Sequence, residues 1–500
     1  MRRVAAETVV VGSGVAGTLV ARELAARGLE CAIVERGGLV PWEEQRRTER
    51  WEAEISTAEH DHEVDPSGID WPWTYVYGVG GGCNRWAGTS PRFLPEDFEM
   101  RSRYGVMSDW PISYADLLPY YVQAEKALSV SGERNDLMPG AGFPLPPHPL
   151  SPQDTVVADA LSPFIALPQA RPSRSVGGRA ACCGSGRCQL CPVDARFSVL
   201  NGLGEVFERP EIRLMAQTRA ARLVSDPSGR RIQAVECVTS HGEWIRVSGK
   251  RFVVAANGIE SPAIMMRSGI ATPDTGRYLF DHRNTKLLVP TRAPVGAGRG
   301  ASLVTGASYA YYRGDFRRKR AAALVLPFNP GSPTMPTSVV EGIVAGRSGR
   351  SIRRAAVAEF ERTLALDLYL DDEPNRRAGV QLSSRRDSFG IPLNAVRWEP
   401  PTAYFNRALT HIARDLPRRL GAVVEGRARP FTAPQGAHQL GTLRMGSGSE
   451  GVVDPDLRHV LRENLFVSGG AVFPTYSPSH PTLTIAALAI RLGRLLATER

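Results

Sequence analysis

Short apolar runs and one amphipathic segment alternate over the first 35 residues. Three valines at positions 9–11 lead into the glycine-rich stretch 12–17. An Ala/Leu-rich segment follows, and a second apolar run at 31–34 ends in Glu35. Short apolar runs beside glycine are typical of buried strands, and apolar positions at helical spacing are typical of a helix that packs on a sheet. The pattern predicts a strand, a glycine turn, a helix and a second strand.

The pattern of apolar and polar positions predicts further elements along the chain. Ser113 has the character of a helix N-cap, with Asp116 in the first turn. Alternating residues at 222–224 and 232–238 flank an Asp-Pro-Ser-Gly turn and predict a hairpin. The apolar residues 251–254 then run into a second strand-to-glycine-to-helix passage.

Between residues 286 and 435 the pattern changes. Strand-like stretches at 322–327 and 365–370 alternate with Gly/Pro turns, and helix-favouring stretches cover 352–362 and 403–420. Short strands separated by turns predict an antiparallel sheet, with the helices packed on it.

The first glycine stretch has the properties of a dinucleotide-binding turn. Gly12 permits the tight turn, Gly14 lets a pyrophosphate approach the backbone, and Gly17 lets the helix pack closely on the strand. The helix N-terminus then offers free N–H groups to phosphate. Glu35 lies 18 positions beyond Gly17, where a carboxylate can hold both hydroxyls of an adenosine ribose. FAD and NAD both satisfy this motif.

Length and charge limit the classes of protein that remain. A chain of 500 residues exceeds what one core usually organises, so two domains are expected. The net charge of +10 comes almost entirely from arginine, since only four of the 61 basic residues are lysine, and the arginines are scattered among acids. This pattern predicts no nucleic-acid partner. No apolar run reaches 18 residues, so no membrane partner is predicted either. We expect a cytoplasmic protein with reduced cysteines, unless they bind metal or do redox work.

A second glycine-rich stretch, residues 78–88, surrounds Trp86 and has the sequence GVGGGCNRWAG. So many glycines suit a backbone that lies against a flat ring system, where side chains would intrude. The stretch resembles the second signature of the glucose-methanol-choline (GMC) oxidoreductases, flavoenzymes in which this loop passes along the FAD. Several members of that family attach FAD covalently through a histidine on the loop. Arg85 occupies that place here, so the resemblance implies noncovalent FAD.

The resemblance continues through a returning strand at 251–262, a closing segment at 276–282, a lid hairpin at 373–392 and a C-terminal signature. It implies an α/β fold, in which a Rossmann-like FAD-binding domain of GMC type carries an inserted substrate domain of antiparallel sheet plus helices. The discontinuous FAD-binding domain is assigned to residues 1–110, 170–285 and 436–500, and the substrate-binding domain to residues 111–169 and 286–435. The residues expected to bind the cofactor are Gly12, Ser13, Gly14, Gly17, Glu35, Arg36, Gly81, Gly82, Trp86, Gly88, Ala221, Gly470, Ala471, Pro481 and Thr482.

Two histidines fall on the catalytic pair of that family. His438 stands in AHQLGTLRMG and His480 in SHPTLTI. Alcohol oxidation needs a neutral base near the hydroxyl while hydride passes to flavin N5, and histidine is tuned to that task. His438 is expected to be the base and His480 its hydrogen-bond partner, although these roles are exchangeable on sequence alone. His282 is expected to be structural because of its place in the closing segment.

Four of the seven cysteines crowd into residues 182–191, namely Cys182, Cys183, Cys188 and Cys191. Their pattern resembles the cluster-binding segment of some GMC sugar dehydrogenases, whose last interval is one residue longer. Crowded thiolates suit an iron–sulfur cluster or zinc. A cluster, reduced thiols or a disulfide, and zinc all stay open, with zinc least favoured because no histidine lies nearby.

The predicted activity is FAD-dependent oxidation of an alcohol to an aldehyde or ketone on a sugar-like small molecule. The chain also resembles dehydrogenases of antibiotic pathways that oxidise a hydroxymethyl group of an aminoglycoside precursor. The alternatives are a sugar or polyol dehydrogenase that passes electrons through an iron–sulfur cluster to a redox protein, an oxidase that uses O2, an NAD-dependent reductase and a flavin-binding interaction subunit. Asp367, Asp371, Asp372 and Glu373 are candidates for contacts to a cationic substrate, but we expect them to be solvated.

Overall fold

A five-stranded parallel sheet holds the N-terminal glycine motif in the structure, a computed structural model that describes residues 1–47, 62–186, 188, 191–298, 303–329, 337–432 and 436–499. Its strands are ordered β18-β10-β2-β3-β6, and all neighbours run parallel. The strands are β2 (Thr8–Val11), β3 (Cys31–Val34), β6 (Ile212–Met215), β10 (Arg251–Val254) and β18 (Leu465–Val467). The predicted strand, turn, helix and strand are confirmed, and so is the α/β fold class.

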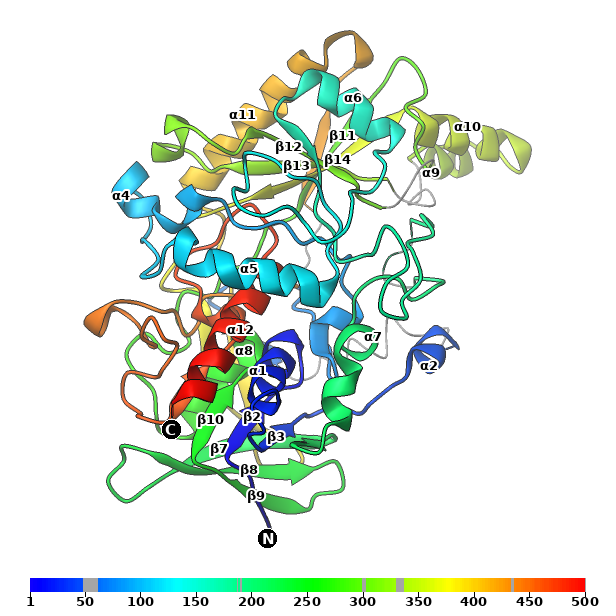
Figure 1. The fold of residues 1–500 in the computed structure, drawn as a ribbon. Helices are drawn as coiled ribbons and strands as arrows, with labels where there is room; N and C mark the ends of the chain where they lie inside the picture. Colours follow the sequence, from blue (N-terminus) through cyan, green and yellow to red (C-terminus); the bar gives the residue numbers. More distant parts are fainter. Residues whose placement is uncertain are drawn as a thin grey trace.

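Helices from the two ends of the chain cover one face of this sheet (Figure 1). Helix α1 (Val15–Ala25) begins directly after the glycine turn and packs against α12 (Thr482–Thr498). Helix α5 (Tyr114–Leu128) packs on the other side of α12. Its predicted N-cap is confirmed, because Ser113 Oγ accepts a hydrogen bond from the backbone N–H of Asp116.

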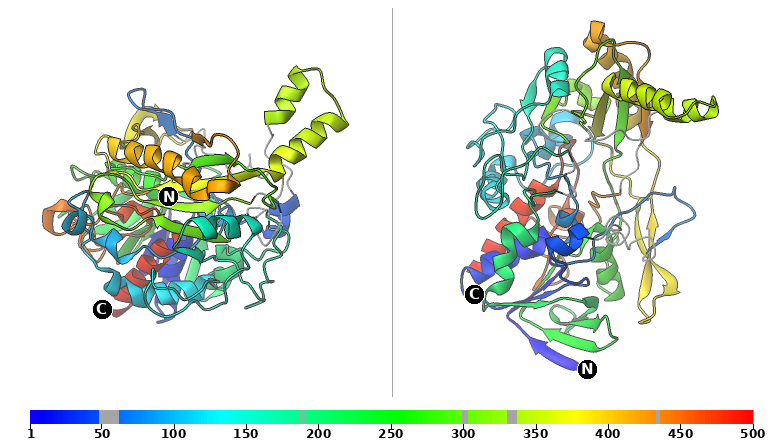
Figure 2. Two further views of the ribbon diagram at one scale, coloured as in Figure 1. Left: turned by 90° about the horizontal axis from the view of Figure 1, so that it is seen from above. Right: turned by 90° about the vertical axis from the view of Figure 1, so that its right-hand side faces the viewer.

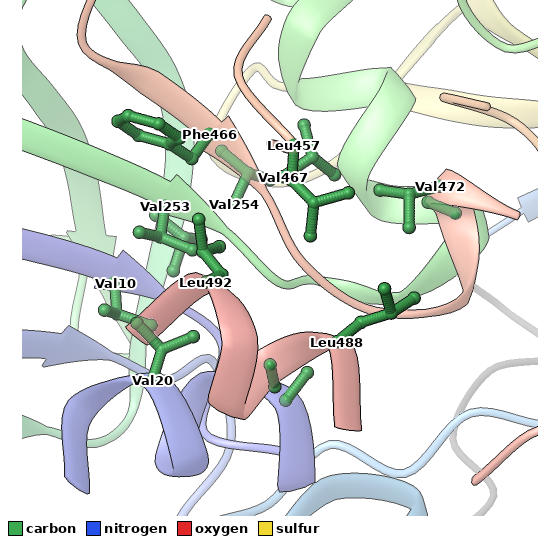
Figure 3. Close-up of a cluster of buried hydrophobic side chains, with 14 of the residues drawn as sticks. Val10, Val20, Val253, Val254, Leu457, Phe466, Val467, Val472, Leu488 and Leu492 are labelled. Atoms are coloured by element: carbon green, nitrogen blue, oxygen red, sulfur yellow. The ribbon is translucent and has the colours of Figure 1, made fainter. Parts of the chain in front are cut away.

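The core between this sheet and its helices is apolar and completely buried (Figure 3). Val10 and Val253 of the sheet, Val20 of α1, and Leu488 and Leu492 of α12 are each 0% exposed. Burying one such side chain contributes about 1.5–3 kcal/mol. This contact therefore fixes the N-terminus of α12 relative to the glycine turn, although the two lie at opposite ends of the sequence.

A four-stranded sheet with the order β1-β9-β8-β7 lies beside the first sheet. Its strands are β1 (Arg2–Ala5), β7 (Thr218–Ser225), β8 (Ile232–Thr239) and β9 (Trp244–Ser248). β7 and β8 are antiparallel, which confirms the predicted hairpin. Helix α8 (Asn257–Arg267) follows β10 and packs on β7.

The predicted antiparallel sheet in the middle of the sequence has six strands, in the order β17-β11-β14-β13-β12-β5. They are β5 (Phe164–Ala166), β11 (Thr285–Pro290), β12 (Gly306–Tyr311), β13 (Ala323–Pro327), β14 (Thr363–Leu370) and β17 (Arg429–Thr432). Helices α6 (Pro152–Ala160) and α11 (Ala403–Leu420) share a buried apolar cluster with it. Helices α9 (Thr337–Val344) and α10 (Arg350–Glu361) project beside the sheet as a pair (Figure 2).

The predicted lid hairpin is present but is not part of the six-stranded sheet. β15 (Gly379–Arg386) and β16 (Pro392–Arg397) are antiparallel, and β4 (His62–Val64) pairs parallel with β16. Val380 and Val396 turn inward and join the core around the five-stranded sheet, where the hairpin packs against α8. Burial of its apolar face therefore places the hairpin against the core of the five-stranded sheet.

Three further short helices of the described ranges are α2 (Trp42–Arg47), α4 (Met100–Tyr104) and α7 (Val199–Leu203). Among the helices of the described ranges, none combines the length and the apolar character needed to cross a bilayer.

Candidate active site

The backbone of the first glycine turn is crowded on one side and open on the other. Gly12 has a φ of +104°, and a Cβ there would lie 2.5 Å from Ala255 O. A Cβ on Gly17 would lie 1.9 Å from Gly12 O. A Cβ on Gly14, in contrast, would meet no atom of the described residues within 4 Å. The peptide at Gly14 is therefore approachable from a cavity, as the pyrophosphate of a dinucleotide requires.

Glu35 turns its carboxylate back toward this glycine turn. Oε2 accepts hydrogen bonds from Ser13 N at 3.0 Å and Ser13 Oγ at 2.7 Å, and Oε1 accepts one from Gly37 N at 2.8 Å. Burial raises the pKa of Glu35 above its ordinary value, although these hydrogen bonds oppose the shift. The acid predicted to hold a ribose is thus fixed at the cavity wall, beside the turn.

The second glycine stretch lies directly on the first turn. Gly80 N donates a hydrogen bond to Ser13 Oγ at 3.3 Å. A Cβ on Gly81 would lie 3.1 Å from Gly14 Cα, which is tighter than most side-chain contacts. Glycine is therefore required here by the approach of two backbones, in addition to any contact with a ring system.

A buried arginine holds the far end of the same loop. Arg196 donates hydrogen bonds to the carbonyls of Trp86 at 2.7 Å and Asn84 at 2.9 Å, and Trp86 Nε1 donates to Phe197 O at 2.7 Å. Arg196 was not among the site residues predicted from the sequence. In a chain with this many arginines, residue type alone carries no signal for such a role.

Both glycine stretches and the C-terminal signature line one cavity of about 530 Å³. The predicted cofactor residues that line it are Gly12, Gly14, Glu35, Arg36, Gly81, Gly82, Trp86, Gly470, Pro481 and Thr482. The predicted residues outside the lining are Ser13, Gly17, Gly88, Ala221 and Ala471. The side chain of Ala221 packs with Val238 and Ile391, while its neighbours Arg219 and Ala220 reach the cavity. The pairing of β7 with β8 shifts register between Ala220 and Arg222, and this irregularity interrupts the simple alternation of the strand.

Three histidines meet at the end of this cavity. His282 Nδ1 lies 2.8 Å from His438 Nδ1, and the ring centroids of His438 and His480 are 5.4 Å apart. Tyr369 from the six-stranded sheet lies over His480, with ring centroids 4.3 Å apart. All four residues line the cavity. The structure therefore brings together the predicted pair, and it adds His282, which the sequence analysis treated as structural.

Burial keeps these histidines neutral. It lowers the pKa of His282 to about 4 and that of His480 to about 3. Burial and the two neighbouring rings lower the pKa of His438 well below its usual value. At neutral pH each ring therefore has one nitrogen with a lone pair, and can accept a proton or a hydrogen bond.

Asp281 anchors the backbone of His438. Asp281 Oδ1 accepts a hydrogen bond from His438 N at 3.0 Å, and Oδ2 accepts one from Trp71 Nε1 at 3.1 Å. The carboxyl is completely buried, which raises its pKa well above its ordinary value. Its nearest approach to His438 Nδ1 is 3.9 Å, beyond hydrogen-bond distance.

The cysteine-rich loop does not assemble a ligand set for a single metal ion within the described residues. Cys188 and Cys191 are buried, Cys182 is half-buried and Cys183 is exposed. Arg171 donates a hydrogen bond to Cys188 Sγ at 3.0 Å, and Ala195 N donates one to Cys191 Sγ at 3.2 Å. In the part of the chain that the structure describes, three or more ligand atoms gather within 4.8 Å at Asp281, His282 and His438, and not at the cysteines. The described sulfurs are therefore too far apart to bind a single ion such as zinc.

Of the four acids expected to be solvated, Glu373 is exposed as predicted, but the expectation is wrong for Asp367, Asp371 and Asp372, which are buried outside the cavity lining. Asp367, Asp371 and Asp372 are 4% exposed or less. They form ion pairs with Lys286, Arg317 and Arg283, respectively. Buried carboxylates in proteins are normally paired in this way. These ion pairs therefore stabilise the six-stranded sheet and its surroundings.

Two models of the GMC oxidoreductase family match residues 165–284 and 374–489 of this chain. The chain belongs to the GMC oxidoreductase family. It is therefore an FAD-dependent oxidoreductase that acts on alcohol groups.

The fructose dehydrogenase large subunit of Gluconobacter japonicus is 27% identical over 99% of this chain and 98% of that protein. The 6'''-hydroxyparomomycin C oxidase of Streptomyces lividus is 29% identical over 98% of this chain and 91% of that protein. Among solved structures, pyridoxine 4-oxidase from Mesorbium loti matches with a TM-score of 0.67 at 20% identity, over 99% of this chain and 100% of that one. The similarity to the solved structure supports the fold alone.

The cavity of this GMC oxidoreductase fits FAD. The open peptide at Gly14 and the carboxylate of Glu35 lie at one end of its lining, and the three histidines lie in the same lining. Helix α12 begins at Thr482, beside His480, so its N-terminal N–H groups face this space. Arg85 also lines the cavity.

Proposed function

We propose that this GMC oxidoreductase oxidises an alcohol of a sugar-like substrate to an aldehyde or ketone, with His438 as the base. The observation that carries the proposal is a neutral imidazole at the wall of the FAD cavity, held by His282 and facing His480. FAD, held by the glycine turns and Glu35, would supply the hydride acceptor. His438 would take the hydroxyl proton, and His480 would orient the substrate oxygen.

Anaerobic reduction of the bound flavin by an alcohol tests this proposal. His438→Ala should retain FAD and slow the reduction at least about a hundredfold, the scale of general-base catalysis. His411→Ala is the matched control, because His411 lies on α11, outside the cavity lining. Reduction at the parent rate in His438→Ala would remove His438 from the mechanism.

The hydroxymethyl group of an aminoglycoside precursor is the specific substrate that we propose. A relative whose name is that of an oxidase of 6'''-hydroxyparomomycin C aligns over nearly the whole chain. The acids at 367, 371 and 372 are engaged in ion pairs, so recognition of the substrate ammonium groups would fall to other residues. Flavin bleaching against a panel of aminoglycosides, neutral sugars and simple alcohols tests this choice. Equal rates with neutral sugars would favour a general sugar dehydrogenase.

We propose O2 as the electron acceptor in preference to an iron–sulfur relay. A relative that aligns over nearly the whole chain is named as an oxidase, and Arg171 already donates a hydrogen bond to Cys188 Sγ. Turnover under air should then release one peroxide per alcohol oxidised. A preparation that contains iron and acid-labile sulfide, and that forms no peroxide, would favour the fructose-dehydrogenase-like alternative.

We also propose that the FAD is noncovalent and that the chain divides into the two predicted domains, except that α5 and the β15–β16 hairpin pack with the FAD-binding domain. Arg85 stands where family members with covalently bound FAD carry histidine. Acid denaturation should therefore release all of the flavin from the precipitated protein into solution. Of the residues that line the cavity in the described ranges, Tyr369 comes from the predicted substrate segments and the others come from residues 1–110, 170–285 and 436–500.

A further inference from the structure

The closing segment places two consecutive residues against His438. Asp281 accepts from the backbone N–H of His438, and His282 contacts its ring. The sequence analysis assigned neither residue to the chemistry. Their positions nevertheless fix where the backbone of the base lies and which way its imidazole faces.

The hydrogen bond between His282 and Ser477 has one possible direction. His282 Nε2 lies 2.6 Å from the backbone carbonyl oxygen of Ser477. A carbonyl oxygen only accepts hydrogen bonds, so His282 Nε2 must carry the hydrogen. His282 is 1% exposed and neutral at pH 7, because burial lowers its pKa to about 4. Its Nδ1 therefore carries a lone pair.

The tautomer of His438 follows from that of His282. The two Nδ1 atoms are 2.8 Å apart, so one of them must donate a hydrogen bond to the other. Since His282 Nδ1 holds a lone pair, His438 Nδ1 must carry the hydrogen. Asp281 lies 3.9 Å from His438 Nδ1 and does not compete for that hydrogen. His438 Nε2 is left with its lone pair, and within the described residues it makes no hydrogen bond.

We infer that His282 is a positioning residue, which transmits the fixed direction of the Ser477 carbonyl to His438 and holds that base as the Nε2-accepting tautomer. This inference rests on the proposed role of His438. In the reaction, the O–H bond of the alcohol breaks and its proton forms a bond to His438 Nε2. The carbinol C–H bond would break at the same time, and its hydrogen would pass as hydride to the FAD that the cavity would hold. The new imidazolium keeps its Nδ1–H bond to His282, so the lone pair of His282 stabilises the developing positive charge.

The other rings around His282 and His438 do not determine which nitrogen of His438 carries the hydrogen. His480 faces His438 with ring centroids 5.4 Å apart, and Tyr369 and Tyr476 lie edge-on to His282, with centroids at 5.5 Å and 5.4 Å. No hydrogen bond links these three rings to either Nδ1 atom within the described residues. The Ser477 carbonyl is thus the group whose fixed direction determines the tautomers of His282 and His438.

Two substitutions of equal size test the inference. His282→Asn keeps an oxygen at the δ position that can accept from His438 Nδ1, and His282→Leu removes the acceptor. His282→Leu should slow anaerobic flavin reduction about tenfold to a hundredfold with little change in KM, because His438 would then populate both tautomers. His282→Asn should retain at least about a third of the rate. Equal rates in the two variants would overturn the inference.

A second measurement does not depend on any substrate. Nitrogen-15 spectra of the histidine-labelled holoenzyme should show an unprotonated Nε2 and a protonated Nδ1 for His438, assigned by comparison with His438→Ala. In His282→Leu the two nitrogen shifts should move toward each other. A protonated Nε2 in the parent protein would overturn the inference, whatever the kinetics. Loss of activity in His438→Ala together with the wrong tautomer would refute this inference and leave the proposed function standing.

Discussion

Ser13 Oγ donates a hydrogen bond of 2.7 Å to Glu35 Oε2, and so joins the glycine turn after β2 to the acid at the end of β3. The same hydroxyl accepts from Gly80 N, so one serine connects three parts of the FAD cavity. These hydrogen bonds therefore hold three segments of the dinucleotide end of the site together. Substitutions there should change affinity for FAD and leave the chemistry of bound FAD unchanged.

Glu35→Ala should weaken FAD binding about tenfold to a hundredfold. Hydrogen bonds to a charged group contribute about 1.5–3 kcal/mol each, and a carboxylate at this place can hold the ribose hydroxyls. FAD titration into apoprotein, followed by flavin fluorescence, measures the effect. Glu30→Ala is the control, because Glu30 is exposed just before β3. Equal affinity in the two variants would show that Glu35 does not contact the cofactor.

His480→Ala should slow flavin reduction about tenfold to a hundredfold, less than His438→Ala. His480 lines the cavity and its Nδ1 has no hydrogen-bond partner in the described part of the chain, so no protein hydrogen bond at Nδ1 holds the ring away from a substrate oxygen. His480→Asn should recover most of the rate, because the amide restores a polar group at the δ position. Stopped-flow reduction at saturating alcohol measures both variants. An alanine variant as fast as the asparagine variant would contradict this role.

Arg317→Met should lower the free energy of unfolding by about 3–5 kcal/mol. Its completely buried guanidinium contacts Asp97 at 2.9 Å and Asp371 at 2.8 Å. Removing it would leave two uncompensated buried carboxylates. Denaturant midpoints measure the loss.

The neighbouring Arg318→Met is the control for Arg317→Met. Arg318 is 55% exposed, and its partner Asp315 lies 3.9 Å away at 94% exposure. Exposed pairs of this kind contribute little. A comparable loss of stability in both variants would assign the effect to the loop and not to the buried ion pair.

His148→Gln should become relatively more stable than the parent protein as the pH falls. His148 is buried against the carbonyl of Arg171, at 2.9 Å, and burial lowers its pKa to about 4. Between about pH 6.5 and pH 4 the unfolded chain binds a proton at His148 and the folded chain does not, so the parent loses stability through this window.

The expected size of the His148 effect is about 1.4 kcal/mol per pH unit, or about 3 kcal/mol over the window. Urea unfolding of both proteins at pH 7, 6 and 5 measures the difference. Other titrating groups are common to the two proteins and cancel. Parallel stability curves would show that the pKa of His148 is not lowered in the folded protein.

Local patterns in the sequence were sufficient for most of the secondary structure. The strand, turn and helix around Gly12 formed as predicted, and α11 has the predicted bounds, because apolar spacing and glycine conformations act over a few residues. The family motifs placed His438 and His480 in the cavity lining. These features depend on residue type and spacing, and both can be read directly from a sequence.

The tertiary structure alone decided how distant side chains interact. It placed His282 against His438, 156 residues away, and paired Asp371 with Arg317. It also turned Ala221 away from the cavity and left the described cysteine sulfurs too far apart to bind one metal ion. The direction of a hydrogen bond or an ion pair depends on the relative placement of two backbones. That placement is set by the packing of whole sheets and helices, which no local pattern in the chain encodes.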